Sequence, residues 1–336
     1  MRRLVGVELT RLRWRRAVQV LVAFALFVPI LVFAITAWNT RSYSDAEMAE
    51  FQTQVDRDTN SIETQQSLKD CLDNPDDFGV PPGEDVQTTC EEWTLPQLDW
   101  YAFREPLNLD TERDAGSGVV VIALLAVLFA LAGTTFAGHD WNTGSMSNQL
   151  LFEPRRGRVW LTKGLVVTLA SGAIAAVVLA AYWTGLWVLA GARSLDPSGH
   201  SVWEGYQQGI RGTALAALCA LCAYAVTMLF RSTVVTLGVL FGLSILAPIL
   251  LALIAFPDNE RWMPQTNIAA VMLDGTTYYG EMVCTSTTDE LGNEIQECGD
   301  STEHKLTLAG GSAYLLGLLA LAAVPSVLTF RRRDVP

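Results

Sequence analysis

A pair of cysteines, Cys219 and Cys222, has the CxxC spacing that redox centres and metal sites use in soluble proteins. The run around them, AALCALCAYAV, is apolar and contains no acid, histidine or second CxxC. The three histidines of the chain, His139, His200 and His304, lie far apart in the sequence and form no metal-binding pattern. We therefore interpret the two cysteines as small packing residues on one helix face, and we expect no metal site.

The other four cysteines indicate disulfide chemistry. Cys71 and Cys90 fall in one polar segment, and Cys284 and Cys298 fall in another. Disulfides persist outside the cytoplasm, and closing a loop of under ~20 residues stabilises a fold by about 3 kcal/mol. We predict the local bonds Cys71–Cys90 and Cys284–Cys298. Four cysteines allow three connectivities, and free thiols are the alternative.

ATP chemistry would need a phosphate-binding loop of the form GxxxxGK[ST]. The chain has three lysines, Lys69, Lys163 and Lys305, and none of them follows a glycine. The sequence also shows no paired carboxylates and no nucleophile with a base at the membrane surface. We therefore expect no enzyme activity and no cofactor in this chain.

Six long apolar stretches form the framework that must position any functional residues of the chain. Each is near or above the ~20 residues that span a bilayer core, and none contains Asp, Glu, Lys, Arg or His. The sequence therefore predicts an all-α membrane protein with six transmembrane helices. Their expected ranges are 17–38, 118–138, 164–190, 212–230, 234–256 and 308–330.

The charges next to these stretches predict the orientation. Residues 1–16 carry six arginines against Glu8, and the tail 331–336 carries three more arginines. Because basic segments stay in the cytoplasm, we expect both termini there, in a multi-pass protein of the plasma or inner membrane. The basic loop 139–163 and the turn at Arg231 agree with this orientation.

The acidic net charge of −12 arises on the opposite side. The extracytoplasmic segment 39–117 holds 19 acids against 5 bases, and the segment 257–307 holds 10 acids against 2. The cytoplasmic side is basic, with 14 bases against 4 acids. Since topology already explains this positive charge, nothing in the pattern favours nucleic-acid binding.

Both extracytoplasmic segments contain helix signals. Ser44 and Glu47 form a capping box, which predicts a helix over 44–73. The run RWMPQTNIAAVMLDG, residues 261–275, is too short in its apolar part to cross a bilayer. It predicts a short re-entrant or interfacial helix.

The loop GHDWNTGSMSNQLLFEPRRGRVWLTKG, residues 138–164, is the most motif-like part of the sequence. Gly144 permits a tight turn, and Pro154 stops a short helix. Leu150 and Leu151 offer an apolar knob that could enter a groove on a partner. The alternative is an ordinary basic loop whose arginines anchor lipid headgroups.

On these residues the chain resembles the permeases of ABC-2 type transporters. In that family an acid, a Gly-Thr or Gly-Ser pair, a Leu-Leu pair, a Pro, an Arg and a Lys at the third span mark the element that contacts the ATPase. The N-terminal residues 1–16 look like the amphipathic interfacial helix of these permeases. The resemblance implies ATPase contact through Asp140, Gly144, Leu150, Leu151, Pro154, Arg155, Arg156, Arg158 and Lys163.

The resemblance implies a type V exporter-like transmembrane domain and the function of a permease subunit in an ATP-driven exporter. A second permease subunit, identical or not, would pair with this one. A nucleotide-binding ATPase subunit would hold ATP and Mg. Because the spans carry no charge, we expect an apolar or amphipathic cargo, such as a lipid, drug or peptide antibiotic, moved out of the cytoplasm or inner leaflet. The alternative is a non-transporting sensor or scaffold that displays the disulfide-closed segments.

Overall fold

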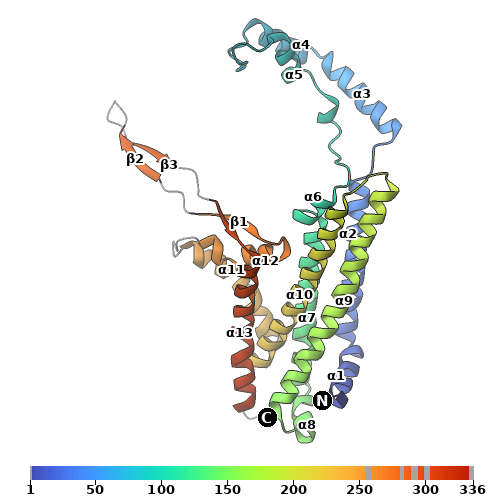
Figure 1. The fold of residues 1–336 in the computed structure, drawn as a ribbon, viewed down its shortest axis with the longest axis vertical. Coiled ribbons are helices and arrows are strands. Elements are labelled where there is room, and N and C mark those ends of the chain that lie inside the picture. The colour runs from blue at the N-terminus through green and yellow to red at the C-terminus, as the bar shows by residue number, and fades with distance from the viewer. Residues whose placement is uncertain (1, 254–258, 281–283, 289–293, 299–302, 333–336) are drawn as a thin grey trace. The chain divides into compact units, whose positions relative to one another are not determined.

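The computed structural model describes residues 2–253, 259–280, 284–288, 294–298 and 303–332. The chain forms two compact units (Figure 1). We call Met1–Ala34 together with Asn108–Pro336 the helical unit, and Ile35–Leu107 the insert unit.

Six helices are long and apolar enough to cross a membrane, which is compatible with a multi-pass membrane protein. Each predicted span falls on one of them, except that residues 254–256 lie outside the described residues. The helices are α2 (Arg16–Asn39), α7 (Ser117–Asn142), α9 (Arg156–Ala192), α10 (Gly199–Phe230), α11 (Thr233–Leu253) and α13 (Leu308–Arg332).

Two of these helices begin well before their apolar runs. α9 begins at Arg156 although its predicted span begins at 164, and α10 begins at Gly199 although its predicted span begins at 212. Both helices extend back almost to a proline, Pro154 or Pro197, because the polar residues in between do not break a helix. Hydropathy marked the apolar parts of these helices and missed their polar first turns.

Shorter helices connect the long ones in the helical unit. They are α1 (Arg2–Arg13), α6 (Leu109–Asp114), α8 (Ser145–Phe152), the 3-10 turn Asn259–Trp262 and α12 (Pro264–Met272). The short helix predicted within 261–275 is confirmed as α12. Within the predicted loop 139–163, α7 continues to Asn142, α8 follows, and α9 begins at Arg156.

The purely helical prediction missed four short strands. β1 (Thr276–Tyr279) pairs antiparallel with β4 (Glu303–Leu306), and β2 (Cys284–Thr288) pairs antiparallel with β3 (Glu294–Cys298). Threonine and tyrosine, which fill β1, favour extended backbone. The sequence signals in this segment are charge, cysteines and one short apolar run, and none of these carries information on strand pairing.

Helix α10 packs along α7 and α9 and also against α13 (Figure 1). Small residues allow the close approach. A Cβ at Gly133 of α7 would collide with the carbonyl oxygen of Ala220 in α10. A Cβ at Gly212 of α10 would lie 2.6 Å from the Ile122 side chain of α7. These contacts are typical of helices that pack in membranes, where small residues let two backbones approach.

The insert unit contains three helices and a 3-10 turn. They are α3 (Asp45–Thr59), α4 (Ile62–Asp73), α5 (Val86–Thr94) and Leu98–Trp100. The prediction of a single helix over 44–73 is wrong, because the helix is interrupted between α3 and α4. The amide of Asn60 donates to the Asp56 carbonyl, and the Ser61 hydroxyl accepts from the Thr64 amide, so one helix is terminated and the next is capped.

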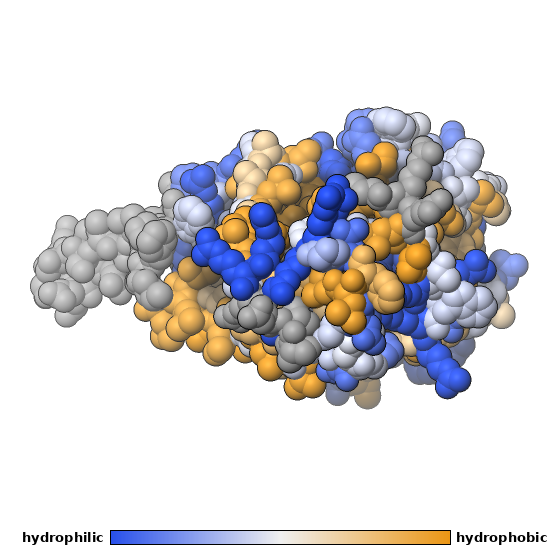
Figure 2. All heavy atoms as spheres, turned by 90° about the horizontal axis from the view of Figure 1, so that it is seen from below, coloured by the Kyte–Doolittle hydropathy of each residue, from blue (hydrophilic) through white to orange (hydrophobic). Residues whose placement is uncertain are grey.

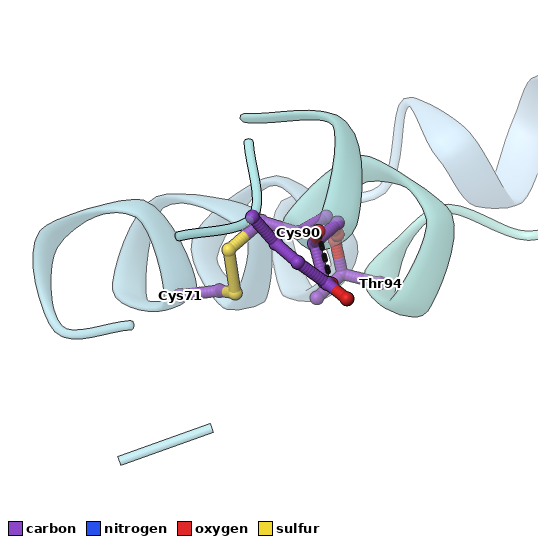
Figure 3. Close-up of a disulfide and its surroundings, with 5 residues drawn as sticks. Cys71, Cys90 and Thr94 are labelled. Atoms are coloured by element: carbon purple, nitrogen blue, oxygen red, sulfur yellow. Dashed lines mark hydrogen bonds between the residues drawn. A yellow bond between two sulfur atoms is a disulfide. The ribbon is translucent and has the colours of Figure 1, made fainter. Parts of the chain in front are cut away.

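The predicted Cys71–Cys90 disulfide is confirmed, and it joins α4 to α5 (Figure 3). Both cysteines are completely buried and form a small core with Val80. The Thr94 hydroxyl donates to the Cys90 carbonyl at 2.6 Å, one turn along α5. The disulfide is therefore a central part of this small core.

The backbone of the β2–β3 hairpin supports the second predicted disulfide. Cys284 and Cys298 are directly opposite each other in the β2–β3 register. Opposed residues of an antiparallel pair have Cα atoms about 4.5–5.5 Å apart, which suits a disulfide. Their side chains lie outside the described residues, so the bond stays a prediction. We expect proteolysis without reductant, followed by mass spectrometry, to recover peptides linked through Cys284 and Cys298. A link from either cysteine to Cys71 or Cys90 would contradict this pairing.

The predicted capping box at the start of α3 is confirmed. The Glu47 amide donates to the Ser44 hydroxyl at 3.3 Å, and the Ser44 amide donates to the Glu47 carboxylate at 2.9 Å. The Ser44 amide and the Arg41 guanidinium together lower the pKa of Glu47 from 4.5 to about 2. A lowered pKa stabilises the folded helix above pH 4.5, and this stabilisation is lost as the pH falls toward 2.

An NMR titration of the Glu47 carboxyl in the full chain should therefore give a midpoint near 2. The Arg41→Gln variant should raise that midpoint, because it removes one of the two main partners of the carboxylate. A wild-type midpoint at the ordinary glutamate value would show that the capping box does not form in solution.

Candidate functional site

Four charged side chains from separate parts of the helical unit meet in a group that we call the charge cluster. It consists of Glu8 on α1, Arg15 between α1 and α2, Asp140 on α7 and Lys163 on α9. Glu8 and Lys163 have no exposed side-chain surface, and Asp140 has 2%. Charged side chains are almost never this buried unless they are paired.

Lys163 holds the two carboxylates together. Its Nζ donates to Glu8 Oε2 at 2.8 Å and to Asp140 Oδ2 at 2.5 Å. Arg15 donates to the other oxygen of Asp140 and to the carbonyl of Phe136. The Phe136 ring lies 5.2 Å from the Lys163 ammonium and 4.7 Å from the Arg15 guanidinium, within cation–π range. These four side chains carry two acids and two bases, and the partly exposed Arg11 lies 3.6 Å from Glu8 Oε1 beside them.

The charge cluster also fixes α8. Gln149 Nε2 donates to Glu8 Oε1 at 2.6 Å, and the Ser145 hydroxyl donates to Asp140 Oδ1 at 2.8 Å. Met146, on the same side of α8, is completely buried. The first turn of this short helix is therefore attached to α7 by the half-buried Ser145, and the second turn is attached to α1 by the buried Gln149.

Gly144 makes the turn from α7 into α8. It has φ +68° and ψ +6°, the left-handed conformation, at the residue before the first turn of α8. A Cβ there would meet nothing within 4 Å, so the requirement for glycine is conformational rather than steric.

The nine predicted contact residues differ in their exposure. Asp140 and Lys163 are buried in the charge cluster, so they can position α8 but cannot contact a partner in this conformation. Leu150 is partly buried against the core that contains Trp160 and Phe330. Arg156 is half-buried. The exposed residues are Gly144, Leu151, Pro154, Arg155 and Arg158.

The end of α8 carries two exposed apolar side chains, which we call the apolar tip. Leu151 is 81% exposed and Phe152 is 91% exposed. The knob predicted from Leu150 and Leu151 is therefore displaced by one residue, because the helical period turns Leu150 toward the core. The exposed arginines Arg155 and Arg158 follow closely in the chain. Figure 2, a view of this end of the molecule, shows hydrophilic side chains beside apolar ones.

Glu8, Arg15, Gln149 and Phe152 were not predicted as site residues. The sequence contains one signal for Glu8, since it is the only acid in residues 1–16, which also hold six arginines. Phe152 directly follows the Leu-Leu pair and extends its apolar character. Nothing in the local sequence indicates that Arg15 and Gln149 meet the cluster.

The two carboxylates of the cluster are engaged in hydrogen bonds on every oxygen. Both oxygens of Glu8 and both oxygens of Asp140 accept hydrogen bonds from protein side chains. Within the described residues, no group of three or more His, Cys, Asp or Glu is placed to hold a metal ion. The arrangement therefore suits a mechanical role, the fixing of α8 to the bundle.

Comparison with known proteins identifies no relative of this chain: no known protein family, no curated protein and no solved structure matches it.

Proposed function

We propose that this chain is the permease subunit of an ABC-2 type exporter, and that α8 is the helix through which an ATPase subunit moves it. The observation that carries this proposal is the apolar tip, Leu151 and Phe152, on a short helix fixed by the buried charge cluster. Adjacent large apolar side chains that are exposed together and flanked by polar residues are typical of protein interaction sites. They lie within the segment that resembles the ATPase-contacting element of these permeases.

The charge cluster explains how a force on α8 could reach the long helices. Glu8, Asp140 and Lys163 connect α1, α7 and α9, and α8 is bonded to two of these residues. The bonds from Ser145 and Gln149 of α8 go to buried carboxylates, and hydrogen bonds to charged groups are worth about 1.5–3 kcal/mol each. In this scheme a displacement of α8 is passed through these bonds to α7 and α1, and through Lys163 to α9.

The energy for such a movement would come from the partner. The sequence has no phosphate-binding loop, so ATP and Mg would bind in the ATPase subunit. In this scheme α8 and both termini lie in the cytoplasm, and the chain resides in the plasma or inner membrane. Two permease subunits, identical or not, would each engage one ATPase subunit.

An apolar groove supports the proposed class of cargo. It has a volume of about 300 Å³ and lies between α2 and α9 of the helical unit. Pro29 and Phe33 of α2 face Val178, Tyr182 and Gly185 of α9 across it. Since this lining is almost entirely apolar, the groove suits an acyl chain or another apolar part of an amphipathic cargo.

Copurification tests the proposal. An affinity-tagged chain, solubilised in mild detergent from its native membrane, should recover a separate subunit that has a P-loop and hydrolyses ATP. A tagged unrelated six-span protein from the same membrane serves as the control for nonspecific capture. If a monodisperse preparation repeatedly contains no ATPase, the exporter proposal is wrong.

The insert unit favours the second candidate function, a non-transporting sensor or scaffold. It is a compact unit with its own disulfide-centred core, as a display module requires. Under this alternative, deletion of residues 44–105 should abolish the cellular function, and no ATPase should copurify. Under the exporter proposal, the same deletion should leave ATPase binding intact, because α8 belongs to the helical unit.

A further inference from the structure

A second polar feature of the helical unit is a cavity of about 530 Å³. Its wall includes Arg15 just before α2, Arg16 at the start of α2, His139 and Asn142 at the end of α7, and Thr233 at the start of α11. Of these residues, only Arg15 belongs to the charge cluster. The volume lies within the range of about 300–1,000 Å³ that is usual for small-ligand sites.

The cavity lies where three candidate spans end. Arg16 is the first residue of one span, Asn142 is the last residue of another, and Thr233 is the first residue of a third. The ends of spans meet the lipid headgroups. Trp14, which is 70% exposed, also lines the cavity, and exposed tryptophans at this depth are typical of the interfacial aromatic belt. The cavity is therefore at headgroup level.

The start of α2 gives the cavity backbone donors. The first three residues of this 24-residue helix, Arg16, Ala17 and Val18, all line it. The first amide groups of a helix have no acceptor within the helix, and they lie at the positive end of its dipole. Such an end favours a phosphate or another anion.

Besides Arg15, which is bonded to Asp140, the wall contains two side chains that can donate to an anion, Arg16 and His139. Arg16 and His139 are both exposed, and in the described part of the chain neither side chain has a hydrogen bond or an ion pair. The acid next to His139 in the sequence, Asp140, is already bonded to Arg15, Lys163 and Ser145. Arg16 and His139 are therefore available to an anion from outside the chain.

We propose that this cavity binds the phosphate group of an anionic membrane lipid. Arg16, His139 and the first amides of α2 would hold the phosphate, and Trp14 would lie beside the glycerol region. The bound headgroup would connect α2, α7 and α11 at their ends. This site is independent of the exporter function, since it needs only the three helix ends and a bilayer.

Native mass spectrometry of the detergent-solubilised full chain tests the site. Wild-type protein given equal amounts of phosphatidylglycerol and phosphatidylcholine should retain phosphatidylglycerol preferentially. The Arg16→Gln/His139→Gln variant should retain about tenfold less of it, because the guanidinium charge and the imidazole donor are both lost. The matched control is Arg13→Gln, since Arg13 is exposed and lies over the Trp14 ring but does not line the cavity.

A further arm identifies the source of the phosphate. If excess inorganic phosphate leaves the bound phosphatidylglycerol in place, the lipid is the ligand; if it displaces the lipid, the cavity is a phosphate site that free anions also fill. Equal retention of both lipids by wild-type protein would overturn the proposal. So would a double variant that behaves like Arg13→Gln. Melting temperatures of all variants should match wild type, because the replaced side chains are exposed.

Discussion

The Lys163→Met substitution is expected to lower the free energy of unfolding of the helical unit by about 3–5 kcal/mol. Methionine keeps most of the volume of the lysine side chain and removes its charge. Of the two buried carboxylates, Asp140 would then keep Arg15, and among the described residues Glu8 would keep only one base, Arg11, which is 3.6 Å away and 40% exposed. An uncompensated buried charge costs far more than a lost surface ion pair.

The matched control is Lys69→Met, which removes the same charge from an exposed lysine of the insert unit. It should change the stability by no more than about 0.5 kcal/mol. The Glu8→Gln/Lys163→Met double variant should recover part of the loss, because Asp140 and Arg15 then form a neutral pair. Thermal melting in detergent, followed by size-exclusion chromatography of the remaining folded protein, measures all three. If the Lys163→Met and Lys69→Met variants have the same melting temperature, the cluster does not stabilise the bundle.

The Leu151→Ala/Phe152→Ala double variant is expected to lose at least tenfold in affinity for the ATPase subunit. Anchor residues of an interface cost 2 kcal/mol or more when truncated, and 1.4 kcal/mol corresponds to a tenfold change. ATP hydrolysis that depends on the permease should fall by a similar factor. The melting temperature should not change, because both side chains are more than four-fifths exposed.

The control for this variant is Ile62→Ala, which truncates an apolar side chain that is 84% exposed on the insert unit. The amount of ATPase recovered with each variant, at equal permease, gives the comparison. ATPase recovery with the double variant equal to that with Ile62→Ala would mean that the apolar tip makes no contact. An unchanged melting temperature separates this result from the loss of stability expected for Lys163→Met.

The features that sequence predicted are those with local causes. Each of the six spans is specified by its own apolar run, and α12 by a run too short to cross a bilayer. The capping box of α3 depends on two residues three positions apart. The Cys71–Cys90 bond followed from the presence of a single cysteine pair in its segment. These signals do not depend on how the helices pack.

The features that sequence missed depend on contacts between distant segments. Glu8 meets Lys163 only because α1 packs against α9, and no local pattern encodes that contact. Asp140 and Lys163 were predicted as partner contacts, and only the packed bundle shows that they are buried. Leu150 packs against the core because Ser145 and Gln149 hold α8 in one orientation on the bundle. The four strands depend on pairing between residues with weak individual preferences.

A photocrosslink from position 152 tests most directly whether α8 is the ATPase contact. A photoreactive phenylalanine analogue in place of Phe152 should, on illumination of native membranes, form an adduct that contains a P-loop ATPase subunit. The same analogue in place of Ile62 should form none. If the analogue at position 152 crosslinks only to lipid or to this chain, the proposed role of α8 is contradicted. Labelling of position 152 by an impermeant reagent from outside intact cells would also contradict it.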